Sequence, residues 1–367
     1  MNQNISLFEE ENDRLKAEES DNINSVMPPK DIVAFNELRS CADLYRLKTK
    51  KQLDLNPDFQ RGIVWTNKSQ TLFVDSLIKQ LPIPSLCISL DINTQKRLVI
   101  DGLQRISTIV KFLDEDEDWK LYKTDDIDDR ISGKKTSQIQ ADNNDLYEIL
   151  ENATIPVTVL RCNYNDKEHM AYLFQIFHRL NSGGNKLYNQ EIRNCIYQGT
   201  LNNHLKSFVR SDIWKLFANV NDAKIEKSRF ANEELLLRFY AFHFSLDSYN
   251  GKLALFLNNF MENNKEIDEE GIQSFHTLIT STLELIINNL GDKINTLSKT
   301  VIEGLLVGVS KNTILLRTLT KDEITEMLQK MLQSQEFSTE SLSEGLSQVE
   351  KVKSRFLKAI TIFSKND

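Results

Sequence analysis

The residues of this chain best suited to chemistry lie in a short loop that holds a carboxylate, a glycine, an amide and a guanidinium. The apolar run Val99-Ile100 stops at Asp101-Gly102-Leu103-Gln104-Arg105, and apolar residues then return at helical spacing. This pattern predicts a strand, a tight turn and a helix. Backbone N–H groups and the helix dipole favour anions at such a turn, and Arg105 is suited to a two-pronged contact with phosphate. The loop therefore predicts a site for a phosphate-bearing ligand, where Asp101 holds a metal ion or positions water. The structural alternative is an ordinary turn in which Asp101 caps the helix.

A second polar cluster lies upstream, in Pro57-Asp58-Phe59-Gln60-Arg61-Gly62-Ile63-Val64-Trp65. Gln60 and Arg61 offer donors beside a glycine that lets another backbone approach closely, and Trp65 offers an aromatic platform. The alternative is a structural turn whose Trp65 fills the core and whose Arg61 is a surface charge. We predict that Arg61 and Arg105 converge on one anionic ligand.

A third cluster runs from Phe177 to Leu187 and continues as Glu191-Ile192-Arg193-Asn194. A helix is expected to end near Leu180, and Asn181-Ser182-Gly183-Gly184 is expected to form the turn after it. Capping of a helix–turn–helix corner explains the glycines, but it does not explain why Arg179 and Asn181 occur together. Glu191 and Arg193 are available for pairing.

The periodicity of the chain predicts the elements that position these clusters. Residues 1–29 are polar and charged and predict a flexible arm. Residues 30–165 alternate helical and strand patterns around a small mixed sheet. Their acidic insertion at 114–144 predicts a solvated loop rather than a calcium site, because the EF-hand glycine and ligand spacing are missing. Residues 166–367 have helical period almost throughout. The expected fold class is α+β, a mixed-sheet N-terminal domain followed by a mostly α-helical domain.

Composition limits the class of protein and its partners. A net charge of −8 excludes a wholly basic, histone-like binder but leaves room for a local basic groove. The four cysteines form no C-x-x-C pair, so we expect a reducing compartment and neither disulfides nor zinc. The first residues do not resemble a secretion signal, and no apolar run is long enough to cross a bilayer. A cytoplasmic protein without a membrane partner is therefore expected.

Taken together and in order, the three clusters resemble one family. The motifs Pro-Asp-Phe-Gln-Arg-Gly-…-Trp, Ile-Asp-Gly-Leu-Gln-Arg and Phe-His-Arg-Leu-Asn-…-Glu-Ile-Arg-Asn are similar to the ordered hallmarks of the GmrSD-type, ParB/sulfiredoxin-like family, from about Asp31 to Asn194. Residues 233–239 and 249–261 resemble the helical extension usual in such chains. The resemblance implies a ParB-like α/β core, nucleotide binding and hydrolysis at the Asp-Gly-x-Gln-Arg loop, and a place in bacterial defence against phage or modified DNA.

The resemblance also implies roles for individual residues. The catalytic candidates are Asp101, Gln104 and Arg105, and Asp101 is the candidate metal ligand. The candidates for nucleotide and phosphate binding are Gln60, Arg61, Gly102, Ser107, Thr108, Arg179 and Asn181. The implied cofactors are an NTP and Mg²⁺. The implied partners are DNA, a partner nuclease or another defence subunit, and a second copy of the chain. The commonest family form has Gln at the position of Leu103, so one side chain able to bond a base or phosphate is lost.

Three functions remain open at this point. The first is a nucleotide-dependent, NTP-hydrolysing regulator that acts on DNA, the second is a DNA-binding module without turnover, and the third is a stand-alone nickase that uses a divalent metal. Restriction enzymes of this type usually carry a His-Asn-His nuclease domain. Here the five histidines are scattered and lack metal-ligand spacing, so we do not expect DNA cleavage through that chemistry.

Overall fold

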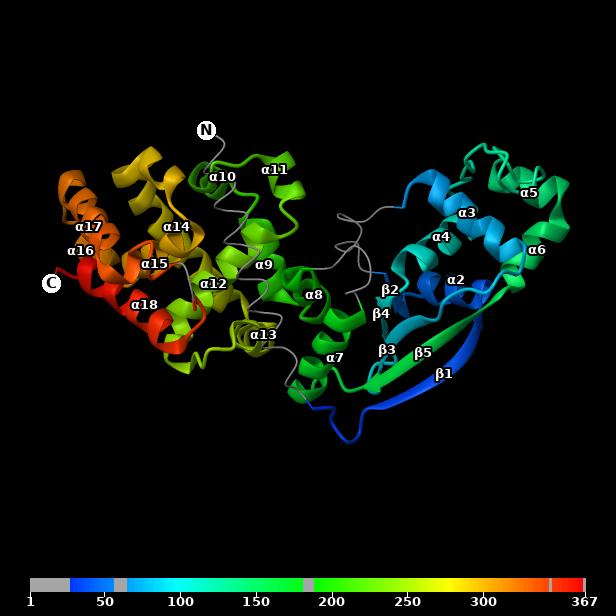
Figure 1. The fold of residues 1–367 in the computed structure, drawn as a ribbon, viewed down its shortest axis with the longest axis horizontal. Helices are drawn as coiled ribbons and strands as arrows, with labels where there is room; N and C mark the ends of the chain where they lie inside the picture. The colour runs from blue at the N-terminus through cyan, green and yellow to red at the C-terminus, as the bar shows by residue number, and fades with distance from the viewer. Residues whose placement is uncertain (1–26, 56–64, 181–187, 343–344, 366–367) are drawn as a thin grey trace. The chain divides into compact units, whose positions relative to one another are not determined.

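The computed structural model describes residues 27–55, 65–180, 188–342 and 345–365. These residues divide into two compact units, one within Met27–Leu187 and the other within Tyr188–Asp367 (Figure 1). The first contains a sheet and the second is helical, as the change of periodicity along the chain predicts.

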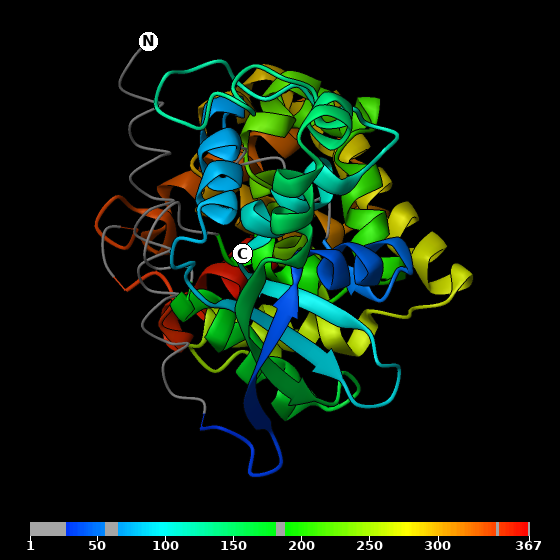
Figure 2. The same cartoon turned by 90° about the vertical axis from the view of Figure 1, so that its right-hand side faces the viewer.

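The sheet unit is built on five strands of mixed direction. Their order in space is β1-β5-β3-β4-β2, in which β1 pairs antiparallel with β5, β5 parallel with β3, β3 antiparallel with β4, and β4 parallel with β2. The strands are β1 (Val33–Ser40), β2 (Leu53–Asp54), β3 (Leu86–Asp91), β4 (Arg97–Asp101) and β5 (Thr154–Cys162). Figure 2 shows the long β1–β5 pair in blue and green. The expected mixed sheet is confirmed.

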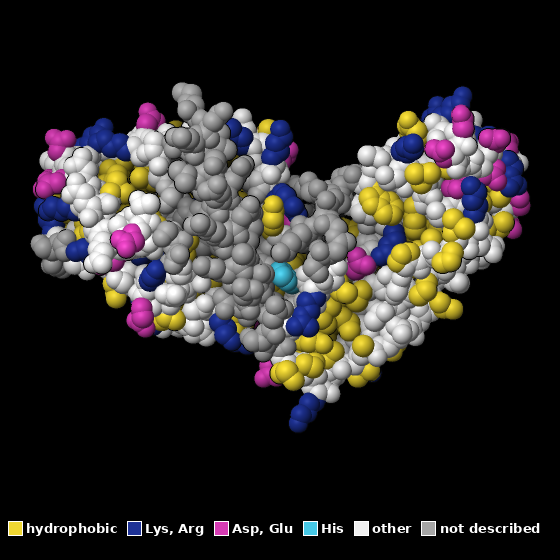
Figure 3. All heavy atoms as spheres, viewed as in Figure 1, with side chains coloured by type: hydrophobic (Ala, Val, Ile, Leu, Met, Phe, Trp, Pro, Cys, Tyr) yellow, Lys and Arg dark blue, Asp and Glu magenta, His cyan; other side chains and the backbone are white. Residues whose placement is uncertain are grey.

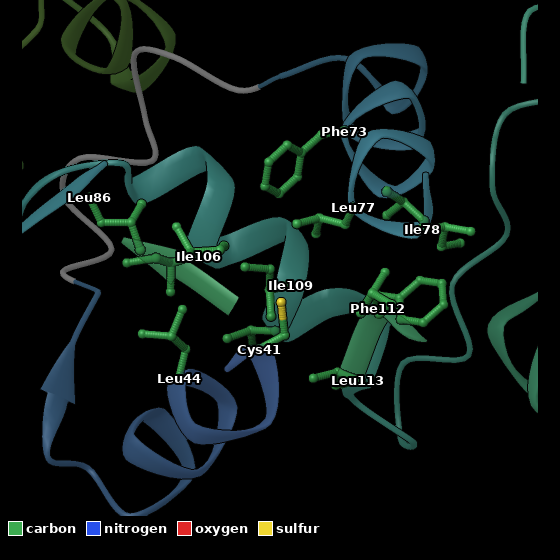
Figure 4. Close-up of a cluster of buried hydrophobic side chains, with 14 of the residues drawn as sticks. Cys41, Leu44, Phe73, Leu77, Ile78, Leu86, Ile106, Ile109, Phe112 and Leu113 are labelled. Atoms are coloured by element: carbon green, nitrogen blue, oxygen red, sulfur yellow. The ribbon is translucent and has the colours of Figure 1, made fainter. Parts of the chain in front are cut away.

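Alternation along the strands decides which face of the sheet is covered. In β5, Ile155, Val157 and Val159 are buried, while Thr154 before them and Pro156 between the first two are exposed. The buried set packs under four helices: α2 (Cys41–Thr49), α3 (Asn67–Ile78), α4 (Leu103–Leu113) and α6 (Asn144–Asn152). Side chains of α2, α3 and α4 point toward one another in this core (Figure 4).

The edge strand β1 carries apolar side chains that are not covered. Leu38 is 70% exposed and Val33 is 51% exposed. Apolar side chains are also visible on the surface over the strands of the sheet unit (Figure 3).

The acidic insertion is anchored to the core and is only in part a solvated loop. Its apolar residues Trp119, Leu121, Ile127 and Ile131 are buried in the same core as the sheet. Its second half adds α5 (Thr136–Asp142), which precedes α6. The insertion differs from the expected solvated loop because apolar residues occur between its carboxylates. Each of these apolar side chains removes surface from water when it packs into the core.

Helix α7 (Lys167–Leu180) belongs to the sheet unit because it packs against β4. The division between the two units therefore lies later in the chain than residue 166, where the helical domain was expected to begin. Helical period alone marks α7 as a helix, but it does not say which unit covers its apolar face.

The second unit is a cluster of helices. They are α8 (Asn189–Ile196), α9 (Thr200–Phe208), α10 (Asp212–Ala218), α11 (Asp222–Lys227), α12 (Ala231–Ser245), α13 (Leu253–Asn264), α14 (Glu269–Leu290), α15 (Lys299–Ser310), α16 (Thr313–Leu316), α17 (Lys321–Gln333) and α18 (Val349–Phe363). Helix α15 is buried along its length and packs against α12, α14 and α18. A Cβ at Gly308 would lie 2.8 Å from the ring of Phe363, so a small residue lets α15 and α18 pack closely. A membrane-crossing helix must be long and apolar, and the described part of the chain has none.

Candidate functional site

The predicted strand, turn and helix are present around Asp101. Strand β4 ends at Asp101, Gly102 has φ 97° and ψ 15°, and α4 begins at Leu103. The positive φ favours glycine, and a Cβ at Gly102 would lie 2.2 Å from Cδ2 of Leu86. Glycine therefore lets the chain turn from the sheet into the helix without displacing the core.

Arg105 and Asp101 form an ion pair across this turn. Nη2 of Arg105 donates to Oδ2 of Asp101 at 2.8 Å. Nη1 of Arg105 donates to the carbonyl oxygens of Pro84 and Ser85, which precede β3. The Arg105 side chain is 13% exposed, whereas the Asp101 side chain is 42% exposed. The guanidinium thus holds the ends of two strands together and presents an accessible carboxylate.

Burial and the neighbouring charge act on Arg105 in opposite directions. Removal of the guanidinium from water lowers the pKa of Arg105, and the Asp101 carboxylate opposes that shift. The guanidinium stays protonated at neutral pH because its ordinary pKa is so high. The pair therefore consists of an enclosed, positively charged Arg105 and a solvent-accessible Asp101 carboxylate.

The first turn of α4 begins without a side-chain cap at its N-cap position. Gly102 occupies the N-cap position, and no side chain of the described residues accepts a hydrogen bond there. Asp101 therefore does not cap the helix, and the structural alternative in which it does is wrong. The first N–H groups of a helix lack partners within the helix and carry its positive dipole end. These donors lie next to the Asp101–Arg105 pair in the chain.

Gln104 connects this loop to the upstream cluster. Its Oε1 accepts a hydrogen bond from the backbone N–H of Trp65 at 3.1 Å. The Trp65 ring packs edge-on against Phe73 with 5.5 Å between centroids, so this ring is part of the core packing. Gln60 and Arg61, the predicted phosphate ligands of that cluster, lie outside the described residues.

The other predicted ligands are in different settings. Thr108 is fully buried, and its hydroxyl donates to the carbonyl oxygen of Gln104 at 2.7 Å. The Ser107 hydroxyl oxygen is buried and has no hydrogen-bond partner in the described part of the chain. Arg179 is exposed in the last turn of α7, and Asn181 lies outside the described residues.

Sequence reasoning missed a row of polar side chains that continues from the Arg105 contact across the sheet. The Ser85 hydroxyl lies 3.3 Å from the Thr158 hydroxyl, which in turn donates to Oδ1 of Asn36 at 2.9 Å. These residues come from three distant segments, and Asn36 and Thr158 are paired in the β1–β5 register. No local signal could have found them, because only strand pairing places them together.

The Glu191–Asn194 part of the third cluster forms a buried network in the helical unit. Arg229 donates to both carboxylate oxygens of Glu191 at 2.9 and 2.6 Å, and the backbone N–H of Tyr188 donates at 2.7 Å. Nε of Arg193 donates to Oδ1 of Asn258 at 2.9 Å. Glu191 and Arg193 are both paired, but with residues of later segments rather than with each other: Glu191 with Arg229, and Arg193 with Glu234 and Asn258.

His169, His204 and His243 have close hydrogen-bond partners within the fold. His169 bonds to Asp31 at 3.0 Å, His204 to Tyr240 at 2.9 Å, and His243 to Ser310 at 2.7 Å. Within the described ranges, no group of three or more His, Cys, Asp or Glu side chains is placed to hold a metal ion.

Comparison with known proteins identifies the domain that carries these clusters. Residues 41–198 match the family described as GmrSD restriction endonuclease, N-terminal domain. No curated protein and no solved structure matches the chain. The matched segment includes all three polar clusters and reaches from α2 into the helical unit. Residues 41–198 of this chain are therefore similar to the N-terminal domain of the GmrSD restriction endonuclease.

Proposed function

We propose that this chain is a nucleotide-binding and NTP-hydrolysing component of a restriction-type defence system that acts on DNA. The nucleotide phosphates bind at the turn between β4 and α4. The observation that carries the proposal is the open Asp101 carboxylate, held by an enclosed Arg105 beside the uncapped start of a helix. Helix starts of this kind bind phosphate through backbone N–H groups.

Each residue of the turn has a distinct part in this proposal. Gly102 lets the chain turn from β4 into α4 at a positive φ, with Leu86 packed where a Cβ would lie. Arg105 is a positioning residue for Asp101, because two of its three nitrogens already bond to protein oxygens. Gln104 fixes the loop against Trp65. Gln60 and Arg61 remain phosphate ligands on the strength of their motif.

The residues present fit a nucleotide-bound Mg²⁺. Mg²⁺ usually takes one or two carboxylates together with phosphate oxygens and water, and Asp101 is an accessible carboxylate at this turn. Mg²⁺ bound there would neutralise charge on the phosphates. In hydrolysis, a water oxygen bonds to the γ-phosphorus and the bond to the bridging oxygen breaks, which yields NDP, phosphate and a proton. In this proposal Asp101 orients that water or holds the ion.

The test measures nucleotide binding and phosphate release separately on the full chain. ATP, GTP, CTP and UTP are supplied with Mg²⁺, and we expect release with at least one of them. Asp101→Asn should reduce release at least tenfold, whereas Asp125→Asn, which alters an exposed carboxylate of the same unit, should leave it unchanged. Absence of both binding and release with all four nucleotides would contradict the proposal.

The two other functions give different outcomes in parallel assays. Salt-sensitive DNA binding that persists in Asp101→Asn, without phosphate release from the wild-type chain, would indicate a DNA-binding module. Conversion of supercoiled plasmid to open circles with Mg²⁺ or Mn²⁺ would indicate a nickase.

A further inference from the structure

The helical unit contains a cavity that the proposed function does not use. Its volume is about 330 Å³, within the range of about 300–1,000 Å³ that small-molecule sites occupy. One wall comes from the segment of α10 to α12 and the other from the start of α15 with the residues before it. Apolar side chains form much of the lining, among them Phe217, Val220, Leu235, Ile294 and Ile302.

Among the described residues, the charged side chains that line this cavity are both cationic. They are Lys224, which is exposed, and Lys299, which is 4% exposed, and no Asp or Glu of the described ranges is part of the lining. The remaining polar lining consists of neutral side chains such as Asn232 and Asn295. The first turn of α15 also lines the cavity, and the dipole of a helix start favours negative charge.

Lys299 shares its carboxylate partner with two arginines. Its Nζ lies 3.3 Å from Oε1 of Glu234. The same carboxylate receives Arg238 at 2.8 Å and Arg193 at 3.5 Å. Glu303 accepts a further contact from Arg238 at 3.4 Å. Lys299 and the two arginines therefore share one carboxylate beside the cavity.

We propose that this cavity binds a small organic anion with an apolar body. The acidic group lies toward Lys224 and Lys299, and the apolar body fills the space between the walls. A purely inorganic anion leaves the apolar lining in contact with water, and a neutral apolar molecule makes no use of the two lysines in the lining. The site lies in a different unit from the Asp101–Arg105 loop and does not depend on nucleotide binding.

Phenyl phosphate is a suitable probe, with phenol and inorganic phosphate as its two halves. Calorimetric titration of the full chain should give one saturable site for phenyl phosphate, with at least tenfold lower affinity for either half. Equal affinity for inorganic phosphate would overturn the proposal, because the apolar lining would then contribute nothing. Failure of phenyl phosphate to bind in the millimolar range would overturn it as well.

Two variants locate the site. Lys224→Gln removes an exposed lining charge and should weaken phenyl phosphate binding about tenfold, the scale of one charge-assisted hydrogen bond. Ala231→Trp places a bulky ring in the cavity and should abolish binding. Lys330→Gln is the matched control, since Lys330 is an exposed lysine on α17 that does not line the cavity. Binding that is unchanged in both lining variants would place the ligand elsewhere and overturn the proposal.

Trp214 provides a direct signal of occupancy. Its indole Nε1 donates to Oδ1 of Asn232 at 3.1 Å, and Asn232 lines the cavity. In a chain labelled with 5-fluorotryptophan, phenyl phosphate should shift the ¹⁹F resonance of Trp214 and leave those of Trp65 and Trp119 in place. A shift confined to Trp65 would instead locate the probe in the sheet unit and contradict the proposal.

Discussion

The Arg105 guanidinium is enclosed by the protein while the Asp101 carboxylate that it bonds at 2.8 Å is open to solvent. The two residues therefore have different roles. Arg105 holds the loop in shape, and the Asp101 carboxylate remains available to a ligand. The pair joins the end of β4 to the residues before β3, so a change at Arg105 should affect both the fold and the site.

Arg105→Lys should reduce both stability and phosphate release. A single ammonium cannot reproduce the planar contacts to Asp101 and to the carbonyl oxygens of Pro84 and Ser85. We expect a loss of about 1–3 kcal/mol in the free energy of unfolding and at least a tenfold loss of phosphate release. Urea unfolding and a phosphate assay measure the two effects. Arg161→Lys, which alters an exposed arginine of the same sheet, is the control.

Gly102→Ala should destabilise the sheet unit through a steric clash as well as through backbone strain. The added Cβ would lie 2.2 Å from Leu86 at a φ of 97°. Gly291→Ala is a matched control, because Gly291 also has a positive φ but no atom within 4 Å of its Cβ position. We expect Gly102→Ala to lower the free energy of unfolding by about 1–3 kcal/mol more than the control does. Equal losses in the two variants would show that the Leu86 contact is unimportant.

Stability should fall as the pH drops from about 6.5 toward 4. Burial lowers the pKa of His204 and of His243 to about 4, from 6.5 when exposed. The unfolded chain therefore binds more protons in this window, so the stability present above pH 6.5 is lost as the pH falls. We expect a loss of about 1–2 kcal/mol for each histidine at pH 5.

Urea unfolding at pH 7.5 and pH 5 measures this dependence. His204→Gln and His243→Asn each keep a neutral hydrogen-bond donor and should each flatten it. A variant with the wild-type pH dependence would show that its histidine is not responsible.

Glu191→Ala should strongly destabilise the helical unit. Glu191 is 4% exposed and accepts hydrogen bonds from Arg229 and from the backbone of Tyr188. Its removal leaves a cation without its partner, which costs about 3 kcal/mol when the pair is buried. Thermal unfolding checks this expectation, with Glu326→Ala on the exposed surface of α17 as the control. A shift in Tm no larger than that of the control would contradict a structural role for Glu191.

Local sequence was enough to predict the elements that carry the candidate site. The apolar run before Asp101 and the helical spacing after Arg105 predicted β4 and α4, because backbone conformation follows the period of burial. The helix that ends near Leu180 and the helical character of the second half were predicted in the same way and are confirmed. Glycine at 102 marked the turn, since few other residues adopt its φ.

The partners of the site residues and the packing of the elements depend on contacts between distant segments. Periodicity along the chain contains no information about these contacts. The carbonyl oxygens of Pro84 and Ser85 engage Arg105, and the pairing of β1 with β5 brings Asn36 to Thr158. Helix α7 packs against β4 in the sheet unit, and Trp119 of the acidic insertion is buried in the core. A side chain's partner depends on how the elements pack in three dimensions, whereas local spacing determines only which face of its own element it occupies.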